Sequence, residues 1–179
     1  MRVIAGRFGG RRLRAPAGDA VRPTTDRVRE ALFSMLEPVE GERVLDLFAG
    51  SGALSCEALS RGAASALLVD RDPRALAVAK ANLAALGLAP PEAVTVRSDA
   101  AAALRKASER GDKYGLVLLD PPYRDATRLV DELGELLPAV LAAGARVVVE
   151  SDRRAVPELA LPLHRERRYG DTIVRIHTT

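Results

Sequence analysis

The sequence contains few of the residues that metal, redox and disulfide chemistry require. Its 179 residues include one cysteine, Cys56, and two scattered histidines, His164 and His177. A single cysteine cannot form an internal disulfide, and these residues show none of the spacings typical of a zinc site. We therefore expect neither a metal site nor a disulfide in this protein.

The sequence also lacks long apolar runs. No stretch approaches the ~20 apolar residues that a membrane-spanning helix needs. The first seven residues already contain two arginines, where a signal peptide would have its apolar core. At 47% hydrophobic residues, the chain has enough apolar side chains for about one domain with a real core. We expect a cytoplasmic monomer that does not interact with membranes.

Negative charge is scarce at the amino-terminal end. Residues 1–29 carry eight arginines and two aspartates, a net charge of +6, so the rest of the chain carries −3 of the total of +3. A basic arm on a nearly neutral body is typical of proteins that bind phosphate backbones, and arginine suits that role through its bidentate fork. A solvated basic tail without a partner is the alternative.

Two short β-like runs form this basic end. Residues 2–6 and 10–14 flank a glycine-rich turn, which predicts a β-hairpin. Such a hairpin is not stable alone, so we expect it to pack on the main domain and to point its arginines outward. Residues 15–23, with two prolines and a glycine, are typical of a linker. We divide the chain into a basic arm with its linker, residues 1–23, and a main domain, residues 24–179.

The main domain alternates between strands and helices. Thr24 or Thr25 can cap a first helix that ends at Glu37-Pro38. Strands are then predicted over 44–48, 66–70, 93–97, 116–120 and 145–150, and helices over 53–61, 73–86, from 100 onward, and 125–137. This alternation indicates a parallel sheet with helices on both faces. The last two strands, 163–169 and 172–177, are joined by Gly170-Asp171, which favours an antiparallel hairpin.

Two predicted strands end in polar motifs. The apolar run at 116–119 is followed by Asp120-Pro121-Pro122-Tyr123, where the prolines end the strand. Ligands of open α/β sheets bind at the carboxyl ends of the strands, so Asp120 and Tyr123 are candidates for chemistry, although a simple strand stop is the alternative.

The second motif is Asp46-Leu47-Phe48-Ala49-Gly50-Ser51-Gly52, between a strand and a helix. Its glycines allow backbone amides to approach a ligand. Phe48 stands where dinucleotide-binding proteins place their first glycine, and no third glycine follows. A pyrophosphate would therefore be poorly bound.

Together the two motifs resemble those of the amino-methyltransferases that use S-adenosylmethionine (AdoMet), whose marks are D-x-F-x-G-x-G and a later [D/N]-P-P-[Y/F]. Residues 22–33, RPTTDRVREALF, resemble the R-P-T-x-x-x-V-R-E-A-[L/I]-F signature of the family that methylates the guanine N2 amine of small-subunit (16S) ribosomal RNA. With RVIAG at 2–6, the resemblance spans most of the chain.

The resemblance implies a Rossmann-like, seven-stranded class I methyltransferase sheet. It is mostly parallel with an antiparallel carboxyl-terminal hairpin, and an amino-terminal hairpin and helix extend it. The implied substrate is a guanine of small-subunit ribosomal RNA, in an assembled or assembling 30S particle.

The loop with Phe48, Gly50 and Gly52 can offer backbone amides to the methionine carboxylate of AdoMet. Asp46 can contact the ammonium group, or it can be a strand-end acid bonded to the loop. Asp70 ends the second strand, where such folds bind ribose hydroxyls, while Asp72 is expected to cap a helix. Further contacts are expected with the adenine, from Arg71 and, by the family resemblance, from Asp99 and the Ala100 amide. Capping of a helix is the alternative for Asp99.

For the acceptor, the Asp120 carboxylate and the Pro121 carbonyl can hold two amine hydrogens and aim the nitrogen lone pair at the methyl group. Tyr123 is expected to stack on the target base, which must be unpaired or flipped. RNA contacts are expected from the arginines of the basic end, namely Arg7, Arg11, Arg12, Arg14 and Arg27.

Several other functions fit part of this pattern. The same chemistry serves adenine-N6 or cytosine-N4 methylation of DNA and glutamine methylation of a protein, and the amino-terminal signature favours RNA. A nicotinamide-dependent oxidoreductase is opposed by Phe48. A non-catalytic RNA-binding module would explain the arginines but not the two strand-end motifs.

Overall fold

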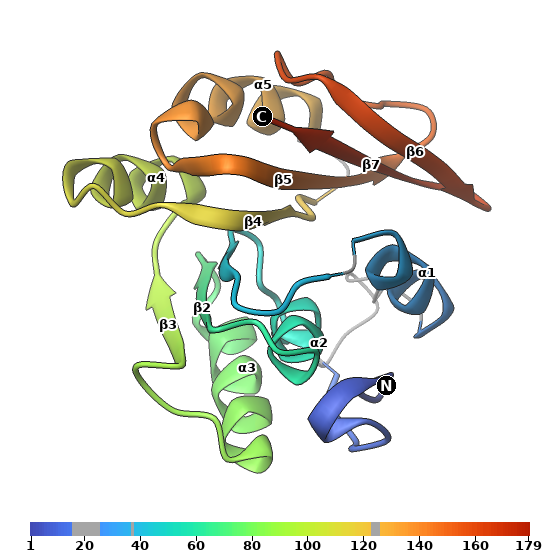
Figure 1. The fold of residues 1–179 in the computed structure, drawn as a ribbon, viewed down its shortest axis with the longest axis vertical. Coiled ribbons are helices and arrows are strands. Elements are labelled where there is room, and N and C mark those ends of the chain that lie inside the picture. Colours follow the sequence, from blue (N-terminus) through green and yellow to red (C-terminus); the bar gives the residue numbers. More distant parts are fainter. Residues whose placement is uncertain (16–25, 37, 123–125) are drawn as a thin grey trace.

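The computed structural model describes residues 1–15, 26–36, 38–122 and 126–179, and its centre is one seven-stranded sheet (Figure 1). The strand order is β3-β2-β1-β4-β5-β7-β6. The first five strands in this order run parallel to one another, and β7 is antiparallel to both β5 and β6. The strands are β1 (Arg43–Asp46), β2 (Ser65–Asp70), β3 (Ala93–Arg97), β4 (Tyr114–Leu119), β5 (Leu141–Asp152), β6 (Leu163–Tyr169) and β7 (Thr172–Thr178). The predicted mostly parallel sheet with an antiparallel hairpin is confirmed.

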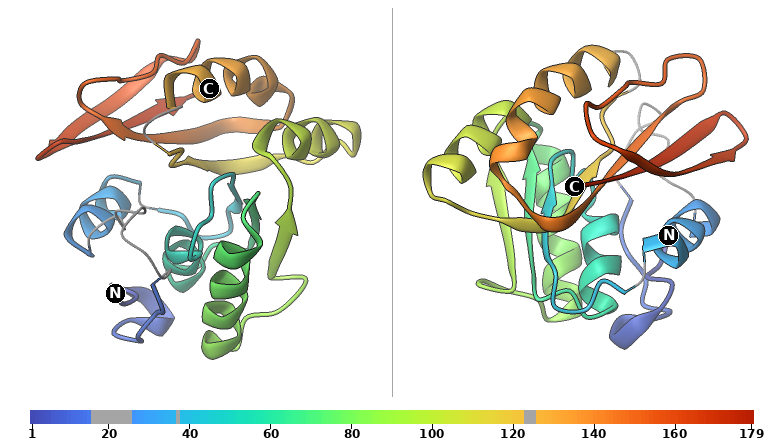
Figure 2. Two further views of the ribbon diagram at one scale, coloured as in Figure 1. Left: turned by 180° about the vertical axis from the view of Figure 1, so that it is seen from behind. Right: turned by 45° about the horizontal axis from the view of Figure 1, so that its top comes forward.

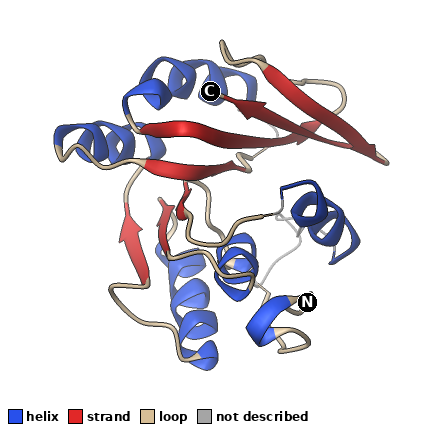
Figure 3. Ribbon diagram, in the orientation of Figure 1, coloured by secondary structure: helices blue, strands red, loops and turns tan. Residues whose placement is uncertain are grey.

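Helices cover both faces of this sheet, as Figure 3 and the left view of Figure 2 show. On one side lie α1 (Asp26–Leu36), α2 (Ala53–Ser60) and α3 (Pro73–Leu86). On the other side lie α4 (Ala100–Glu109), α5 (Ala126–Leu136) and the short η2 (Leu137–Ala139). None of the helices in the described ranges is long and apolar enough to cross a membrane.

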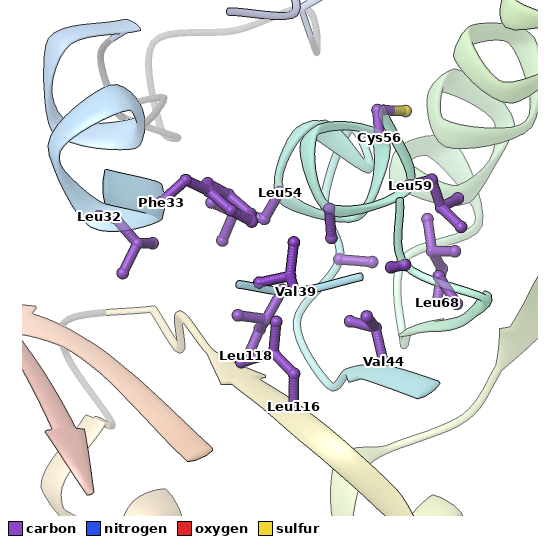
Figure 4. Close-up of a cluster of buried hydrophobic side chains, with 14 of the residues drawn as sticks. Leu32, Phe33, Val39, Val44, Leu54, Cys56, Leu59, Leu68, Leu116 and Leu118 are labelled. Atoms are coloured by element: carbon purple, nitrogen blue, oxygen red, sulfur yellow. The ribbon is translucent and has the colours of Figure 1, made fainter. Parts of the chain in front are cut away.

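The central strand β4 shows why the sheet can be buried on both faces. Its Leu116 and Leu118 pack with α1 and α2 in one core, which Figure 4 shows, whereas Val117 and Leu119 pack with α4 and α5 in a second core. Successive side chains of a strand point to opposite faces, so a continuous apolar run fills both cores.

The element bounds differ from prediction mainly at β5. The prediction began at residue 145, but the strand begins at Leu141, which pairs with Tyr114 of β4 before an irregularity in the register. Ala142-Ala143-Gly144 has low strand propensity, which hid this extension. β1 ends at Asp46, so Leu47 and Phe48 belong to the following turn and not to the strand.

The amino-terminal segment packs on the main domain, and its two runs pair as the predicted hairpin over a short stretch. Arg2 and Arg12 form an antiparallel bridge, flanked by hydrogen bonds from the Leu13 amide to the Met1 carbonyl and from the Val3 amide to the Arg11 carbonyl. The connection between the runs contains the 3-10 turn η1, Gly6–Phe8. It packs closely on α2: a Cβ at Gly6, whose φ is +80°, would lie 1.9 Å from the Ser60 carbonyl oxygen.

Hydrogen bonds to a buried carboxylate hold this segment in place. Glu57 of α2 is buried and accepts hydrogen bonds from the amides of Ile4 at 2.7 Å and Ala5 at 3.1 Å. Val3 and Leu13 lie in the same apolar core as α1 and α2. Residues 1–15 are therefore anchored to the main domain through Val3, Leu13 and the bonds to Glu57.

Candidate active site

A cleft of about 1140 Å³ lies along the carboxyl ends of β1, β2, β4 and β5. Both sequence motifs reach it, although they are more than 60 residues apart in the chain. The predicted site residues that line it are Phe48, Gly50, Asp70, Arg71, Asp99, Ala100, Asp120 and Pro121. Asp46 and Gly52 lie outside this lining, and Tyr123 lies outside the described residues.

The glycine loop after β1 is tied to the neighbouring strands. The Leu47 amide donates to Leu118 of β4 at 3.1 Å, and the Ala49 amide donates to Val69 of β2 at 2.9 Å. Gly52, with φ +76°, packs so closely that a Cβ would lie 2.9 Å from a methyl carbon of Leu68. Gly52 therefore brings α2 close to the sheet, while Gly50 faces the cleft.

Asp70 fixes the end of β2 to this loop. Its Oδ2 accepts from the Gly50 amide and its Oδ1 from the Asp72 amide, both at 2.8 Å. A carboxylate oxygen has two lone pairs, so each oxygen can still accept from a ligand hydroxyl in the cleft. Asp72 accepts from the Arg74 amide at 2.8 Å, with Pro73 in the first turn, so the predicted helix cap is confirmed.

Asp99 occupies the corresponding position after β3. Its Oδ1 accepts from the Ala102 amide at 2.8 Å and caps α4, which confirms the capping alternative. The residue also lines the cleft beside Ala100, at the positive end of the α4 dipole. Helix capping and ligand contact are therefore compatible at this position.

Asp46 is the most deeply buried acid of the site. Only 1% of it is exposed, its Oδ2 accepts from the Ser55 hydroxyl at 2.7 Å, and its Oδ1 has no hydrogen-bond partner among the described residues. Burial raises the pKa of Asp46 to about 7; the Asp70 charge adds to this, while the Ser55 hydroxyl and the Phe48 amide oppose it. Asp46 therefore lies behind the loop as a carboxyl group with an unused acceptor.

The acceptor half of the cleft is built at the ends of β4 and β5. Pro121 is buried and Asp120 is half-buried where β4 ends. The sequence reasoning missed several further lining residues on this side, among them Asp152, Arg154 and Asp171. Asp152 ends β5 and could have been found by the same strand-end rule as Asp70, whereas no sequence signal places Asp171 here.

The predicted RNA-binding arginines differ in their surroundings. Arg12, Arg14 and Arg27 are exposed. Arg7 forms an ion pair with Glu92, and Arg11 donates to the Ala85 carbonyl near the end of α3. All five are exposed, as expected of arginines that point outward, but Arg7 and Arg11 also bond groups of the same chain. A carboxylate and a helix-end carbonyl of the same chain attract them.

Comparisons with known proteins agree with this geometry. The family model described as Conserved hypothetical protein 95 matches residues 1–178. The Bacillus subtilis protein YlbH is 42% identical over 99% of this chain and 98% of its own length. Ribosomal RNA small subunit methyltransferase D of Escherichia coli strain K12 is 39% identical over 99% of this chain and 89% of its own.

A solved structure of similar length has the same fold. The Escherichia coli protein yhhF superposes with a TM-score of 0.85 at 37% identity, covering 99% of this chain and 97% of that one. The family resemblance seen in the sequence is therefore confirmed. The chain belongs to the methyltransferase family that the Conserved hypothetical protein 95 model describes, together with ribosomal RNA small subunit methyltransferase D.

Proposed function

We propose that this protein transfers a methyl group from AdoMet to the exocyclic N2 amine of a guanine in small-subunit (16S) ribosomal RNA. The observation that carries the proposal is the meeting of the glycine loop, Asp70 and the Asp120-Pro121 pair in one cleft. The named relative from Escherichia coli supports ribosomal RNA as the substrate class. The assembled or assembling 30S particle is the proposed form of that substrate.

The cofactor half of the cleft is our proposed AdoMet site. Asp70 would bind the ribose hydroxyls, the loop that contains Phe48, Gly50 and Gly52 would contact the methionine carboxylate, and Arg71, Asp99 and Ala100 would surround the adenine. The amides of Gly50 and Gly52 are bonded within the chain, to Asp70 and to the Ala49 carbonyl, so the expectation that these two amides bind the carboxylate is wrong. The buried Oδ1 of Asp46 lacks a partner, and we assign the ammonium group to it. When bound, AdoMet supplies a methyl group that its sulfonium makes strongly electrophilic.

The acceptor half supplies positioning. An exocyclic amine is a weak nucleophile, because its lone pair is conjugated into the base. The Asp120 carboxylate and the Pro121 carbonyl would each accept one amine hydrogen, which leaves the lone pair directed at the methyl group. No strong base is needed before the transfer, because the alkylated amine becomes acidic. Tyr123 would stack on the base, worth about 1–3 kcal/mol in single-stranded nucleic-acid binders.

We assign the RNA phosphates to basic residues of two parts of the chain. Residues 1–23 act as the basic arm, with Arg7, Arg11, Arg12 and Arg14 as its contacts, and Arg27 adds a contact from the catalytic domain, residues 24–179. A second basic surface is β6, which is exposed along nearly its whole length and carries Arg165, Arg167 and Arg168. The turn after β6 contains Asp171, which lines the cleft, as does Arg154. RNA phosphates would contact both parts while the flipped guanine enters the cleft.

Labelled AdoMet tests this proposal directly. The protein would be incubated with protein-free 16S RNA, with 30S particles and with duplex DNA, followed by mass spectrometry of the nucleosides. We expect N2-methylguanosine from the particle and less of it from free RNA, because a small enzyme has little surface with which to read RNA sequence alone. Label in N6-methyladenine or N4-methylcytosine of the DNA, and none in RNA, would replace the proposal with the DNA alternative.

A further inference from the structure

One buried side chain of α3 bonds two distant parts of the chain. Asn82 is 1% exposed. Its Nδ2 donates to the Ser51 carbonyl at 2.9 Å and to the Arg14 carbonyl at 3.1 Å, and its Oδ1 accepts from the Arg14 amide at 2.8 Å. Both amide hydrogens and the amide oxygen are therefore used on the backbones of two other segments.

These two segments have different proposed tasks. Ser51 lies between Gly50 and Gly52 in the cofactor loop and lines the cleft. Arg14 is near the end of the described part of the basic arm, and the residue before it, Leu13, donates from its amide to the Met1 carbonyl at 3.0 Å. Met1 also lines the cleft. The arm and the cofactor loop therefore meet at Asn82.

Other side chains hold the amino-terminal segment away from the loop. Glu57 and Ser60 of α2 bind the backbone of Ile4, Ala5 and Phe8, one to two turns beyond the start of the helix at Ala53. Asn82, in contrast, bonds both Arg14 and Ser51. A change in the order of the arm can therefore affect the cofactor loop through the side-chain amide of Asn82.

We propose that Asn82 is a positioning residue that couples the arm to the cofactor loop, so that RNA on the arm and AdoMet in the cleft strengthen each other's binding. This rests on the proposed function, in which the arm contacts RNA. Ordering either segment fixes the shared Asn82 side chain, so the second ligand pays a smaller entropic cost. Such coupling is reciprocal, which allows it to be measured from either side.

Hydrogen exchange measures the coupling without any RNA. Saturating S-adenosylhomocysteine should slow exchange of the Arg14 amide in the wild-type protein by on the order of fivefold, the lower end of typical coupling. Asn82→Asp keeps an acceptor for that amide but loses both bonds that Nδ2 donates, to the Ser51 and Arg14 carbonyls. The slowing should therefore disappear. Ser60→Ala is the matched control: it loosens the same arm at α2, away from the loop, and should preserve the slowing.

Two outcomes of this experiment overturn the inference. One is an Arg14 amide that exchanges equally fast with and without S-adenosylhomocysteine in the wild-type protein. The other is slowing that survives in a folded Asn82→Asp variant. Should that variant fail to fold, as judged by circular dichroism, the wild-type measurement still decides.

A binding measurement in the presence of RNA distinguishes a failure of this inference from a failure of the proposed function. Protein-free 16S RNA should tighten S-adenosylhomocysteine binding about fivefold in the wild type and leave it unchanged in Asn82→Asp. Equal tightening in both proteins would contradict the role of Asn82. If the wild-type protein binds neither protein-free 16S RNA nor 30S particles, the proposed function fails instead, and the exchange of the Arg14 amide alone decides whether the arm and the loop are coupled.

Discussion

The two halves of the cleft are built in different ways. In the cofactor half, Asp70 and Asp99 are already held by backbone amides: Asp99 by its own strand-to-helix turn, and Asp70 by its own turn and by the Gly50 amide of the neighbouring loop. In the acceptor half, Asp120 and Pro121 share the cleft with residues from the end of β5 and from the β6–β7 turn, 30 to 50 residues further along the chain. Strand-to-helix turns thus prepare the binding groups, whereas packing of more distant segments assembles the groups for the acceptor. Substitutions in the two halves should consequently change different measured quantities.

The largest effect is expected from Asp120→Ala. Loss of the carboxylate that orients the amine should lower the methyl-transfer rate by on the order of a hundredfold, the scale seen when one preorganised polar group is removed. Affinity for S-adenosylhomocysteine, measured by calorimetry, should stay nearly constant, because the loop at Gly50 is untouched. Asp120→Asn keeps one acceptor oxygen and should retain more activity than Asp120→Ala.

The contradicting result concerns folding. If Asp120→Ala unfolds the protein while Asp120→Asn restores both the fold and the full rate, Asp120 would be a structural strand-end acid. Asp120 would then have no role in the acceptor half of the cleft.

Asp70→Ala is expected to act on the other half. It should weaken AdoMet binding by about 1–3 kcal/mol, because ligand hydroxyls lose a charged acceptor. The transfer rate at saturating AdoMet should change little. Asp72→Ala is the matched control: it removes the α3 cap, worth about 1 kcal/mol of stability, and should leave AdoMet affinity unchanged. Unchanged affinity in Asp70→Ala would exclude Asp70 from the cofactor site.

Asp46 should make stability depend on pH. Its folded pKa of about 7 lies above the ordinary value of 3.8, so between these values the folded chain holds a proton that the unfolded chain has lost. The free energy of unfolding should therefore fall as the pH rises through this range, by at most about 1.4 kcal/mol per pH unit for one proton. At higher pH, Asp46 is ionised in both the folded and the unfolded chain, and the loss of stability remains.

Thermal unfolding between about pH 5 and pH 8 tests this, with Asp46→Asn as the variant that cannot titrate. The wild type should lose stability over this range more steeply than the variant. Saturating AdoMet should reduce the difference, because an ammonium group near Asp46 favours its ionised form. Parallel pH profiles of the two proteins would mean that Asp46 has an ordinary pKa.

The smallest effects are expected from single arginines of the arm. Arg12→Gln should reduce the slope of log affinity against log salt for 16S RNA by about 0.7–0.9 if Arg12 contacts one phosphate. Arg7→Gln should change that slope less, because Arg7 is paired with Glu92. AdoMet affinity should be the same in both variants. An unchanged slope in Arg12→Gln would remove Arg12 from the RNA interface.

The difference between local turns and long-range packing also explains how much could be predicted from the sequence. Asp70 and Asp120 were found because each stands at the end of an apolar run that forms a strand, and the ends of parallel strands gather at one edge. Asp99, two residues beyond the exposed end of β3, was found from the family resemblance. The antiparallel return of β7 brings Asp171 to the cleft, and the docking of residues 1–15 on α2 brings Met1 there. Such contacts depend on tertiary packing, which no local pattern encodes.

The arm shows the same limit. Its glycines predicted the turn and the short hairpin correctly, but not that Ile4 and Ala5, next to the turn, donate their amides to the carboxylate of Glu57. Glu57 is more than 50 residues away in the sequence. Its buried position on α2 gave no signal that it would hold another segment.

The separation of the two halves is tested most directly by measuring both quantities on both variants. Single-turnover methyl transfer to 30S particles at saturating AdoMet, and the affinity for S-adenosylhomocysteine, would be determined for Asp120→Asn and Asp70→Ala. We predict a crossed result, in which Asp120→Asn lowers the rate with affinity intact and Asp70→Ala lowers the affinity with the rate intact. A fall of rate and affinity together in both variants would contradict the division of the cleft into a cofactor half and an acceptor half.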